Sequence, residues 1–400
     1  GRTQWLGVNG LKKLLPTLPI QVAGVRYWDG QFEDARLALT LARTAARAGA
    51  EVCNHTAVTA LIASPEGWTA DLQEAHTGHT RQVTARCVVN ATGVWVDGLR
   101  QLALANKVDK SHALRPLVHP SQGVHLVVDR ATLPLQEAVL VPRTADGRVL
   151  FAVPWLGSTV IGTTDTPRDD APLEPRPMAE ELAFLFEQTR ASLGVQLRPE
   201  QVKSVWVGLR PLVQPQGREG SGPTSQLSRE HLIVQEAPGF WTVTGGKWTT
   251  YRSMAQQVMD AMVHSGDASQ APCPADTRSH LLDGAQAEGG TARSLKDAPG
   301  PHLLGTHAPE LLNLPGHDVA LGLGLTEAMV RYSARHEWAI TVEDMLARRW
   351  RMLFLDARLA EQVAPRVAQL LEEETGQDAA LAPFLALCRQ YRLPEGSTNE

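Results

Sequence analysis

Apolar residues recur every three to four positions in several stretches of the chain, which is the spacing of one buried helical face. One such stretch contains Leu37, Leu41 and Ala45, and Gly49 supplies a C-terminal stop signal. Helices are predicted on this basis over 33–48, 178–193, about 249–264 and much of 301–393. The pattern therefore places most of the predicted helical residues at the end of the chain.

Shorter apolar runs bounded by glycine, proline or polar turns predict strands. They cover residues 51–62, 68–74, 82–89, 114–128, 139–162, 202–213, 231–235 and 240–244. The runs 68–74 and 82–89 flank a polar turn and are predicted to pair. Residues 265–301 are rich in Gly, Ala, Asp and Pro and are typical of a linker. We therefore expect a mixed α/β part up to about residue 264 and a helical part from about residue 301.

Composition narrows the class of protein. The chain has 400 residues, of which 43% are hydrophobic and 20% charged, so it can fill the cores of two or three globular domains. Its net charge of −5 disfavours a nucleic-acid groove. The four cysteines are widely separated without a CxxC pair, so we expect no metal site and a reducing compartment. No apolar run reaches the length of a membrane span.

The most informative stretch is 241–252, where a strand ends at Gly245 and Gly246 and a helix begins almost at once. Two residues without a Cβ let the backbone approach a flat ligand closely, and the helix N-terminus favours negative charge. Lys247 adds a cation beside a ring that gains negative charge on reduction. An ordinary tight turn with a solvated lysine explains the same pattern, so both interpretations stay open.

Other candidate residues lie beside turns or within strands. Asn90 to Gly93 forms a second junction of small residues after a buried strand, where open α/β sheets bind ligands. Arg210 and Arg229 follow turn-rich stretches, and arginine suits phosphate recognition. His125 lies in the middle of a predicted strand. A simple turn, a solvated arginine and a satisfied core histidine are the competing structural explanations.

Residues Arg348, Arg349, Trp350 and Arg351 form a basic cluster with one aromatic residue on a predicted helix. Contact with a membrane surface is one interpretation of such a cluster. A solvated helix face is the other, and it is the one that we favour here.

Taken together, several strings resemble the FAD-dependent glycerol-3-phosphate dehydrogenases. They occur in the order of that family and span nearly the whole chain. They lie at 27–36, 89–95, 161–166, 208–212, 228–231, 245–252 and 336–349. A single string of this kind would be weak evidence, whereas the ordered series is specific.

The resemblance implies an amino-acid-oxidase-like flavoprotein of the α/β (α+β) class. Such a protein has an FAD domain, a substrate domain built on a mixed sheet, and an all-helical C-terminal domain. We expect a partial FAD-binding domain over 1–110, with some substrate-domain strands near 20–30. The remaining expected parts are a substrate domain over 111–235, a return to the FAD domain over 236–265, a linker over 266–300 and the helical domain over 301–400.

The resemblance also implies oxidation of sn-glycerol 3-phosphate to dihydroxyacetone phosphate, with hydride transfer to FAD and electrons passed to a membrane quinone. Arg210 and Arg229 match substrate-holding arginines, Lys247 matches a lysine beside the flavin, and His125 matches a pocket histidine. Either His125 or a deprotonated Lys247 could take the hydroxyl proton; we favour His125, because cationic Lys247 is more useful beside reduced flavin. The residues expected to contact FAD are Ala91, Thr92, Gly93, Gly208, Gly245, Gly246, Thr249 and Thr250.

The front of the chain departs from the family pattern. The family begins with a strand and a Gly-rich turn that cradle the FAD pyrophosphate, but this chain starts at Gly1 without a GxGxxG motif. We therefore expect a fragment that lacks the N-terminal dinucleotide-binding segment. A glycerol-3-phosphate oxidase that uses oxygen and a non-catalytic fragment unable to hold FAD are the alternatives. We expect a cytoplasmic location, with peripheral contact to the inner face of the membrane and a homodimer both left open.

Overall fold

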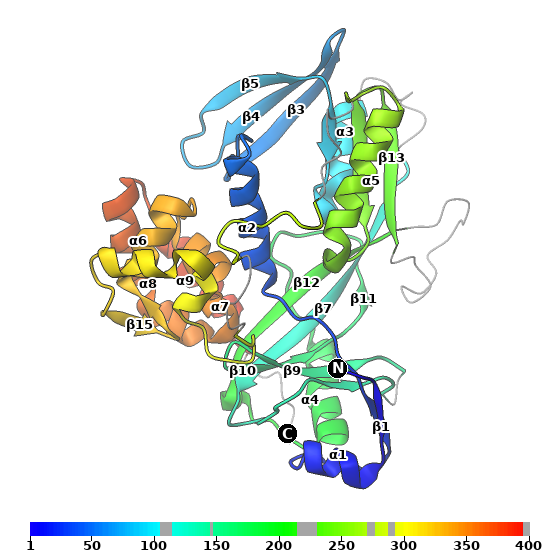
Figure 1. The fold of residues 1–400 in the computed structure, drawn as a ribbon, viewed down its shortest axis with the longest axis vertical. Coiled ribbons are helices and arrows are strands. Elements are labelled where there is room, and N and C mark those ends of the chain that lie inside the picture. Colours follow the sequence, from blue (N-terminus) through cyan, green and yellow to red (C-terminus); the bar gives the residue numbers. More distant parts are fainter. Residues whose placement is uncertain (105–113, 145–146, 214–229, 270–276, 287–292, 395–400) are drawn as a thin grey trace.

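The computed structural model describes residues 1–104, 114–144, 147–213, 230–269, 277–286 and 293–394. These residues form an elongated molecule (Figure 1). A six-stranded sheet occupies its middle, a smaller sheet with two helices lies at one end, and a group of helices lies to one side.

The central sheet is antiparallel throughout. Its strands are β7 (Val118–Asp129), β8 (Val139–Val141), β9 (Leu150–Trp155), β10 (Ser158–Gly162), β11 (Thr166–Pro167) and β12 (Val202–Val213). Strand β7 pairs with β12 along one edge and with β10 and β11 along the other. Helix α4 (Ala179–Leu193) coincides with a predicted helix and packs against one face of this sheet.

Strand β7 is buried on both sides. Val124, Leu126 and Val128 belong to the core that includes α4 residues, whereas Val127 joins the core of the helical region. Alternate residues of a strand point to opposite faces, so an unbroken apolar run fits a strand that is covered twice. The run of apolar residues at 124–128 therefore reflects two separate cores.

The smaller sheet combines segments from distant parts of the chain. Strand β14 (Phe240–Gly245) pairs in parallel with β6 (Val88–Asn90) and antiparallel with β13 (His231–Ala237). The flanking helices are η1 (Gly93–Trp95), α3 (Val96–Leu104), η4 (Trp248–Thr250) and α5 (Tyr251–His264). Both strands of the parallel pair run directly into a helix, so both strand-to-helix junctions lie at one edge of this sheet.

Three further strands form a separate antiparallel meander, β3 (Thr56–Ser64), β4 (Gly67–Glu74) and β5 (Thr80–Ala85). The pairing predicted across the polar turn is confirmed, because Trp68 lies opposite Ala85 and Gln73 opposite Thr80. The small elements near the N-terminus are β1 (Gln4–Leu6), α1 (Val8–Leu14) and β2 (Gly24–Arg26). One further short helix, η2 (Pro199–Gln201), directly precedes β12.

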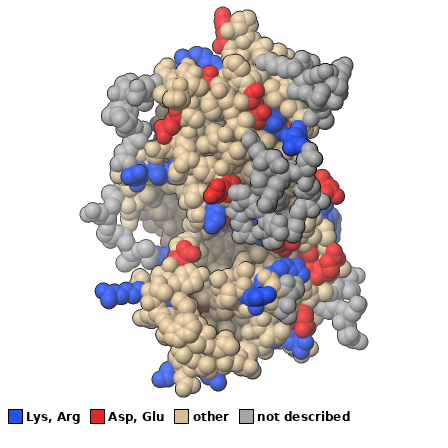
Figure 2. Space-filling view, turned by 90° about the vertical axis from the view of Figure 1, so that its right-hand side faces the viewer, with Lys and Arg blue, Asp and Glu red and all other residues tan. Residues whose placement is uncertain are grey.

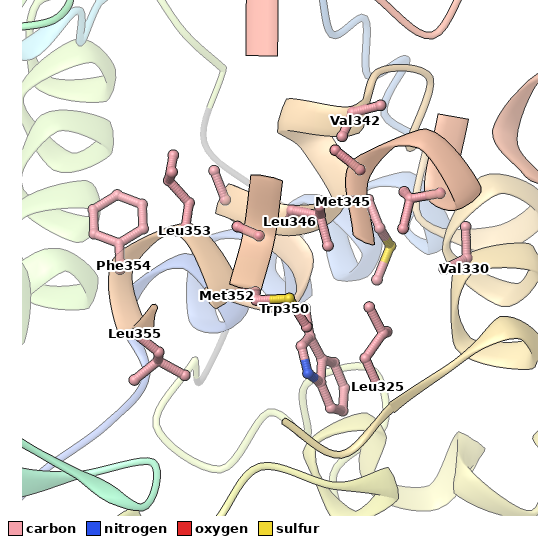
Figure 3. Packing of buried hydrophobic residues seen from close by; sticks show 14 of the residues in the cluster. Leu325, Val330, Val342, Met345, Leu346, Trp350, Met352, Leu353, Phe354 and Leu355 are labelled. Carbon is pink, nitrogen blue, oxygen red and sulfur yellow. The ribbon is translucent and has the colours of Figure 1, made fainter. Parts of the chain in front are cut away.

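The helical region has its own core, shown in Figure 3. Its helices are η5 (Pro301–Asn313), α6 (Glu327–His336), η6 (Asp344–Arg349), α7 (Met352–Leu355), α8 (Ala357–Thr375) and α9 (Leu381–Gln390). The prediction of helices alone misses a short hairpin of β15 (Ala320–Gly322) and β16 (Leu325–Thr326). The buried Trp350 donates a hydrogen bond from Nε1 to the Leu323 carbonyl, 2.9 Å away, and thereby ties the hairpin turn to the helical core.

The basic cluster at 348–351 is not a solvated helix face, so that expectation is wrong. Trp350 is 1% exposed, and the side chains of Arg349 and Arg351 are about 10% exposed or less. The Arg349 guanidinium donates to the backbone carbonyl of Glu337, and Arg351 pairs with Glu33 at 3.0 Å. The pattern of charges in the sequence did not reveal these partners, because one is a backbone carbonyl and the other, Glu33, lies in a distant segment.

An ionic network joins helix α2 (Asp34–Arg47) to the helical region. Arg36 and Arg43 both pair with the buried carboxylate of Glu337, and Arg43 also pairs with Asp283 at 2.6 Å. Ser333 donates a further hydrogen bond to Glu337, at 2.9 Å. Glu337 is therefore the shared anion for two arginines of another element, and its loss removes the carboxylate that pairs with Arg36 and one of the two that pair with Arg43.

We predict that Glu337→Gln destabilises the chain by about 3 kcal/mol, since removing one partner of a buried ion pair strands the other charges. Urea unfolding followed by circular dichroism measures this change. Glu373→Gln is the matched control, because the Glu373 side chain is 51% exposed and its pair with Arg331 should contribute less than about 1 kcal/mol. Equal effects of the two substitutions would contradict the structural role given to Glu337.

Candidate active site

The pairing of β7 with β12 places the candidate residues on one face of the central sheet. His125 lies opposite Trp206, and Ser121 lies opposite Arg210. The His125 and Trp206 rings are stacked, with centroids 4.0 Å apart and planes inclined by 18°. The ring centroid of Phe151 lies 5.7 Å from that of His125. Phe151 belongs to β9, which is separated from β7 by β10, on the side of β7 opposite β12. His125 is thus held within a small group of aromatic rings.

Arg210 reaches across the sheet toward the same face. Its Nη2 donates to the Thr163 hydroxyl at 3.0 Å, and its Nη1 lies 3.6 Å from Asp165 Oδ1. A Cβ on Gly123 would collide with the Arg210 guanidinium and with the Thr163 hydroxyl. Glycine at position 123 therefore lets the arginine cross β7 and brings a fixed positive charge toward His125.

The environment of His125 favours its neutral form. Burial lowers the pKa of His125 to about 3, the positive charge of Arg210 contributes in the same direction, and a backbone hydrogen bond with Gly123 opposes both. The imidazole is consequently uncharged at neutral pH and has a nitrogen lone pair with which to accept a proton. This is the protonation state that a general base needs before the reaction begins.

The two predicted strand-to-helix junctions do come together. The Thr244 hydroxyl at the end of β14 donates to the Gly93 carbonyl at 3.2 Å. Buried Asn90 donates to the Val96 carbonyl at 2.9 Å and thereby closes the other junction. Gly93 has a φ of +65°, and a Cβ there would meet no described atom within 4 Å. Ala91 and Thr92 beside it are exposed, so small residues and open space occur at this edge.

Gly245 and Gly246 are explained by close packing within the chain and do not require a bound ligand. Gly245 and Gly246 have φ values of +75° and +73°. A Cβ on Gly245 would come within 2.5 Å of Val213 and 2.7 Å of the Glu230 carbonyl, and one on Gly246 within 2.8 Å of the Met254 sulfur. Contacts within the chain therefore account for both glycines, and a role toward a cofactor stays a prediction.

The remaining predicted residues are placed as follows. Lys247, Thr249 and Thr250 are exposed on the turn after β14. Gly208 is exposed on β12, opposite Gly123, and a Cβ on it would touch no described atom within 4 Å. Arg229 lies outside the described residues.

An apolar hollow of about 290 Å³ connects the Gly93 junction with β12. It is lined by Gly93, Val94, Trp95, Pro172, Leu173, Pro175, Val207, Leu209 and Pro211. The lining residues of β12 alternate with Gly208 and Arg210, so the hollow and the Arg210 side chain lie on opposite faces of that strand. The hollow borders the small-residue junction from the side away from His125.

Sequence reasoning missed three residues of the site. Thr163 and Asp165 hold the Arg210 side chain, and Trp206 stacks on His125. Trp206 precedes Gly208 and Arg210 by two and four positions, which is the spacing of one strand face, and this signal could have found it. The partners of Arg210 lie within the string 161–166, but only the folded structure shows that they contact Arg210.

The residues present fit part of an FAD molecule. Exposed Ala91 and Thr92, with the open space at Gly93 and Gly208, suit the approach of a flat ring and its side chain. Helix α5 follows η4 beside this edge, and no side chain caps its N-terminus. Within the described ranges, no group of three or more His, Cys, Asp or Glu residues is arranged to hold a metal ion. None of the described helices is long and apolar enough to cross a membrane.

Comparison with known proteins identifies the class. Residues 1–255 match the family model described as FAD dependent oxidoreductase, and residues 245–382 match that of the C-terminal domain of alpha-glycerophosphate oxidase. The chain therefore belongs to the FAD dependent oxidoreductase family, whose cofactor is FAD. This confirms the resemblance inferred from the ordered strings and the expected flavoprotein fold.

Individual relatives are more specific. The chain is 35% identical over 381 residues to a mitochondrial glycerol-3-phosphate dehydrogenase of Arabidopsis thaliana, covering 88% of this chain and 59% of that protein. It is 33% identical over 386 residues to the mitochondrial enzyme of Homo sapiens, covering 89% and 51%. The crystal structure of the Bacillus halodurans glycerol-3-phosphate dehydrogenase with FAD superposes with a TM-score of 0.78 at 25% identity, covering all of this chain and 84% of that one. The chain spans about half the length of the curated relatives it matches.

We predict that His125 makes folding depend on pH between about 6.5 and 3. The unfolded chain protonates this histidine near pH 6.5, whereas the folded chain keeps it neutral down to about pH 3. Acidification through this window therefore favours the unfolded state, by up to about 1.4 kcal/mol per pH unit. His125→Gln should flatten the dependence of the unfolding free energy on pH by that slope, measured by urea titrations from pH 4 to pH 7.

His55 supplies a control of opposite sign. A hydrogen bond to Asp344 raises the pKa of His55, so its contribution is present at low pH and is lost as the pH rises above about 6.5. His55→Gln should thus alter the slope above pH 6.5 and leave the His125 window intact. An unchanged acid slope in His125→Gln would show that this imidazole is not kept neutral by the fold.

Proposed function

We propose that this chain forms the substrate-binding part of an FAD-dependent enzyme that oxidises sn-glycerol 3-phosphate to dihydroxyacetone phosphate. The single observation that carries the proposal is the placement of neutral His125 and cationic Arg210 on one face of the central sheet. The relatives of Arabidopsis thaliana and Homo sapiens, which are named glycerol-3-phosphate dehydrogenases, point to the same substrate.

Arg210 anchors the phosphate in this proposal. Its guanidinium is fixed by Thr163 and faces Asp165, and it is only partly exposed, so a phosphate dianion would gain charge-assisted hydrogen bonds there. Anchoring a group remote from the reacting carbon orients the C2 atom toward the cofactor. Arg229 is proposed as a second arginine at the polar end of the substrate.

His125 takes the proton of the C2 hydroxyl. Its neutral ring nitrogen accepts this proton as the C2–H bond breaks and the C–O bond becomes a carbonyl. FAD, when bound, supplies the acceptor of the hydride from C2. A phosphate dianion beside Arg210 offsets the positive charge that lowers the pKa of His125, so substrate binding makes the histidine a better base.

The proposed cofactor contacts lie at the shared edge of the two strand-to-helix junctions and on β12. They are Ala91, Thr92, Gly93, Gly208, Gly245, Gly246, Thr249 and Thr250. Lys247 is exposed beside them and is proposed to place a cation near the flavin ring. The support is strongest for the 91–93 junction and Gly208, where the structure leaves open space, and weakest for the diglycine.

We propose a membrane quinone as the electron acceptor. Trp95 is 46% exposed and Leu173 is 78% exposed at the rim of the apolar hollow, which suits an apolar acceptor or a membrane surface.

Figure 2 shows acidic and basic side chains interspersed on the face it presents. The described cysteines Cys53, Cys87 and Cys388 are free, in keeping with the proposed cytoplasmic side of a membrane. A homodimer is a further proposal from the family resemblance.

Oxygen is the second candidate acceptor, because residues 245–382 match a model named for an alpha-glycerophosphate oxidase. Parallel assays of hydrogen peroxide release and of reduction of a water-soluble quinone separate the two. Peroxide formed in proportion to substrate consumed would identify an oxidase. Quinone reduction without peroxide would identify a dehydrogenase.

The proposed function is tested with the 400-residue chain incubated with FAD. Bound flavin is measured from its visible absorbance after gel filtration, and turnover from the reduction of a redox dye by sn-glycerol 3-phosphate. Dye reduction that requires this substrate is the expected result. A chain that retains FAD but does not oxidise the substrate overturns the proposal, and a chain that retains no FAD supports the non-catalytic alternative.

We predict that Arg210→Ala lowers kcat/KM on the order of 100-fold, which corresponds to a loss of about 2–3 kcal/mol of transition-state stabilisation. The loss should appear mainly in KM, because the substitution removes a charged anchor from a partly buried site. Steady-state kinetics measure the effect, and FAD retention should not change. Arg190→Ala is the matched control: Arg190 is exposed on α4 and pairs with Glu187. Unchanged kinetics in Arg210→Ala would remove this residue from the substrate site.

A further inference from the structure

Trp206 contacts the candidate base through the face of its ring alone. The ring centroids lie 4.0 Å apart and the planes are inclined by 18°, so the indole is stacked on a face of the His125 imidazole. The indole Nε1 is buried and has no hydrogen-bond partner in the part of the chain that the structure describes. A buried tryptophan usually satisfies its N–H, so this one is held by packing rather than by a polar contact. Its position therefore depends on what lies behind it.

The helical region holds β12 at three consecutive residues around this tryptophan. The Ser204 hydroxyl donates to the Leu353 carbonyl at 3.0 Å. The Val205 backbone N–H donates to the Tyr391 carbonyl at 2.7 Å. The ring of Phe354 meets Trp206 edge-on, with centroids 5.6 Å apart and planes at 66°. Two hydrogen bonds and one aromatic contact thus fix this part of the strand.

Phe354 is itself held by a charged group. The Arg351 guanidinium lies 3.8 Å from the Phe354 ring centroid and pairs with Glu33, the residue that caps helix α2. Figure 3 shows Phe354 projecting from α7 at the margin of the helical core. A continuous series of contacts therefore runs from Glu33 through Arg351, Phe354 and Trp206 to His125.

We propose that Trp206, held by Phe354 of the helical region, is a positioning residue that fixes the His125 ring for proton transfer. The inference deepens the proposed function and rests on it for the kinetic effect alone. The stack limits rotation of the imidazole about its side-chain bonds and keeps water from one of its faces. The charged groups that also bear on the ring are Arg210, with its partner Asp165, and, beyond the two aromatic rings, Arg351 with Glu33.

The first test observes His125 directly and needs no turnover. The chain is labelled with ¹⁵N-histidine, and the ring signals of His125 are assigned by their loss in His125→Gln. In Trp206→Leu we expect the midpoint of the His125 titration to rise from about 3 toward its ordinary value near 6.5, because water reaches the exposed face of the ring. In Trp206→Phe the aromatic cover is kept, and the midpoint should stay close to that of the unchanged chain.

Two further variants separate positioning from general stability. Phe354→Leu removes the ring behind Trp206 and should shift the His125 titration in the same direction, which also decides the matter if Trp206→Leu fails to fold. Phe384→Leu truncates another buried phenylalanine of the same core, on α9, which makes no ring contact among the described residues. It should lower stability and leave the titration unchanged. Equal midpoints in folded Trp206→Leu, Phe354→Leu and the unchanged chain overturn the inference.

Kinetics provide the second test. Trp206→Leu should lower kcat for sn-glycerol 3-phosphate by about 10- to 100-fold, since small misplacements of a catalytic group have effects of this order, while KM changes little. Trp206→Phe should restore most of the loss. If the unchanged chain binds FAD but has no such activity, the proposed function fails and the titration still decides the positioning role. Normal kcat in Trp206→Leu with an active unchanged chain overturns the inference and leaves the function standing.

Discussion

The antiparallel register between β7 and β12 is the constraint on which the candidate site depends. It sets His125 opposite Trp206 and Ser121 opposite Arg210. A shift of β7 by one residue would turn His125 and Ser121 to the face covered by α4, away from Trp206 and Arg210. Such a shift is opposed by two cores at once, because Val127 packs with the helical region while its neighbours Leu126 and Val128 pack on the other side. Hydrophobic burial on both faces of β7 thus fixes the positions of His125 and Arg210 in the candidate site.

The helical region supports this register from one side. It contributes the carbonyls of Leu353 and Tyr391 to β12, and it places Phe354 against Trp206. It is tied in turn to helix α2 through Glu337, which Arg36 and Arg43 share. The C-terminal helices are therefore more than a cover on the sheet, since their packing reaches the ring on which the proposed proton transfer depends.

Local patterns in the sequence predicted what depends on local physics. The 3.6-residue period found α4, and alternation with a polar turn found the β4–β5 pair. Patterns failed where partners come from afar. Arg349 and Arg351 look like a solvated face, yet Arg351 is buried against Glu33 from a distant segment, and Arg349 is buried against Asp344 and the Glu337 carbonyl. The stack of His125 on Trp206 depends on strand pairing across 81 positions, which a single sequence does not report. The ordered family strings supplied the rest of the functional expectation.

In the proposed function, Arg210 links substrate binding to the basicity of His125 through its positive charge. Without substrate, its positive charge adds to the effect of burial, and the pKa of His125 is lowered to about 3. Asp165 Oδ1 lies 3.6 Å from the same guanidinium. A phosphate dianion has more charge than a carboxylate and forms several hydrogen bonds with a guanidinium. Its arrival would offset the positive charge that lowers the pKa of His125, so the ring would gain basicity when a phosphorylated alcohol is in place. In the proposed function, the same arginine therefore selects the substrate and makes proton removal depend on it.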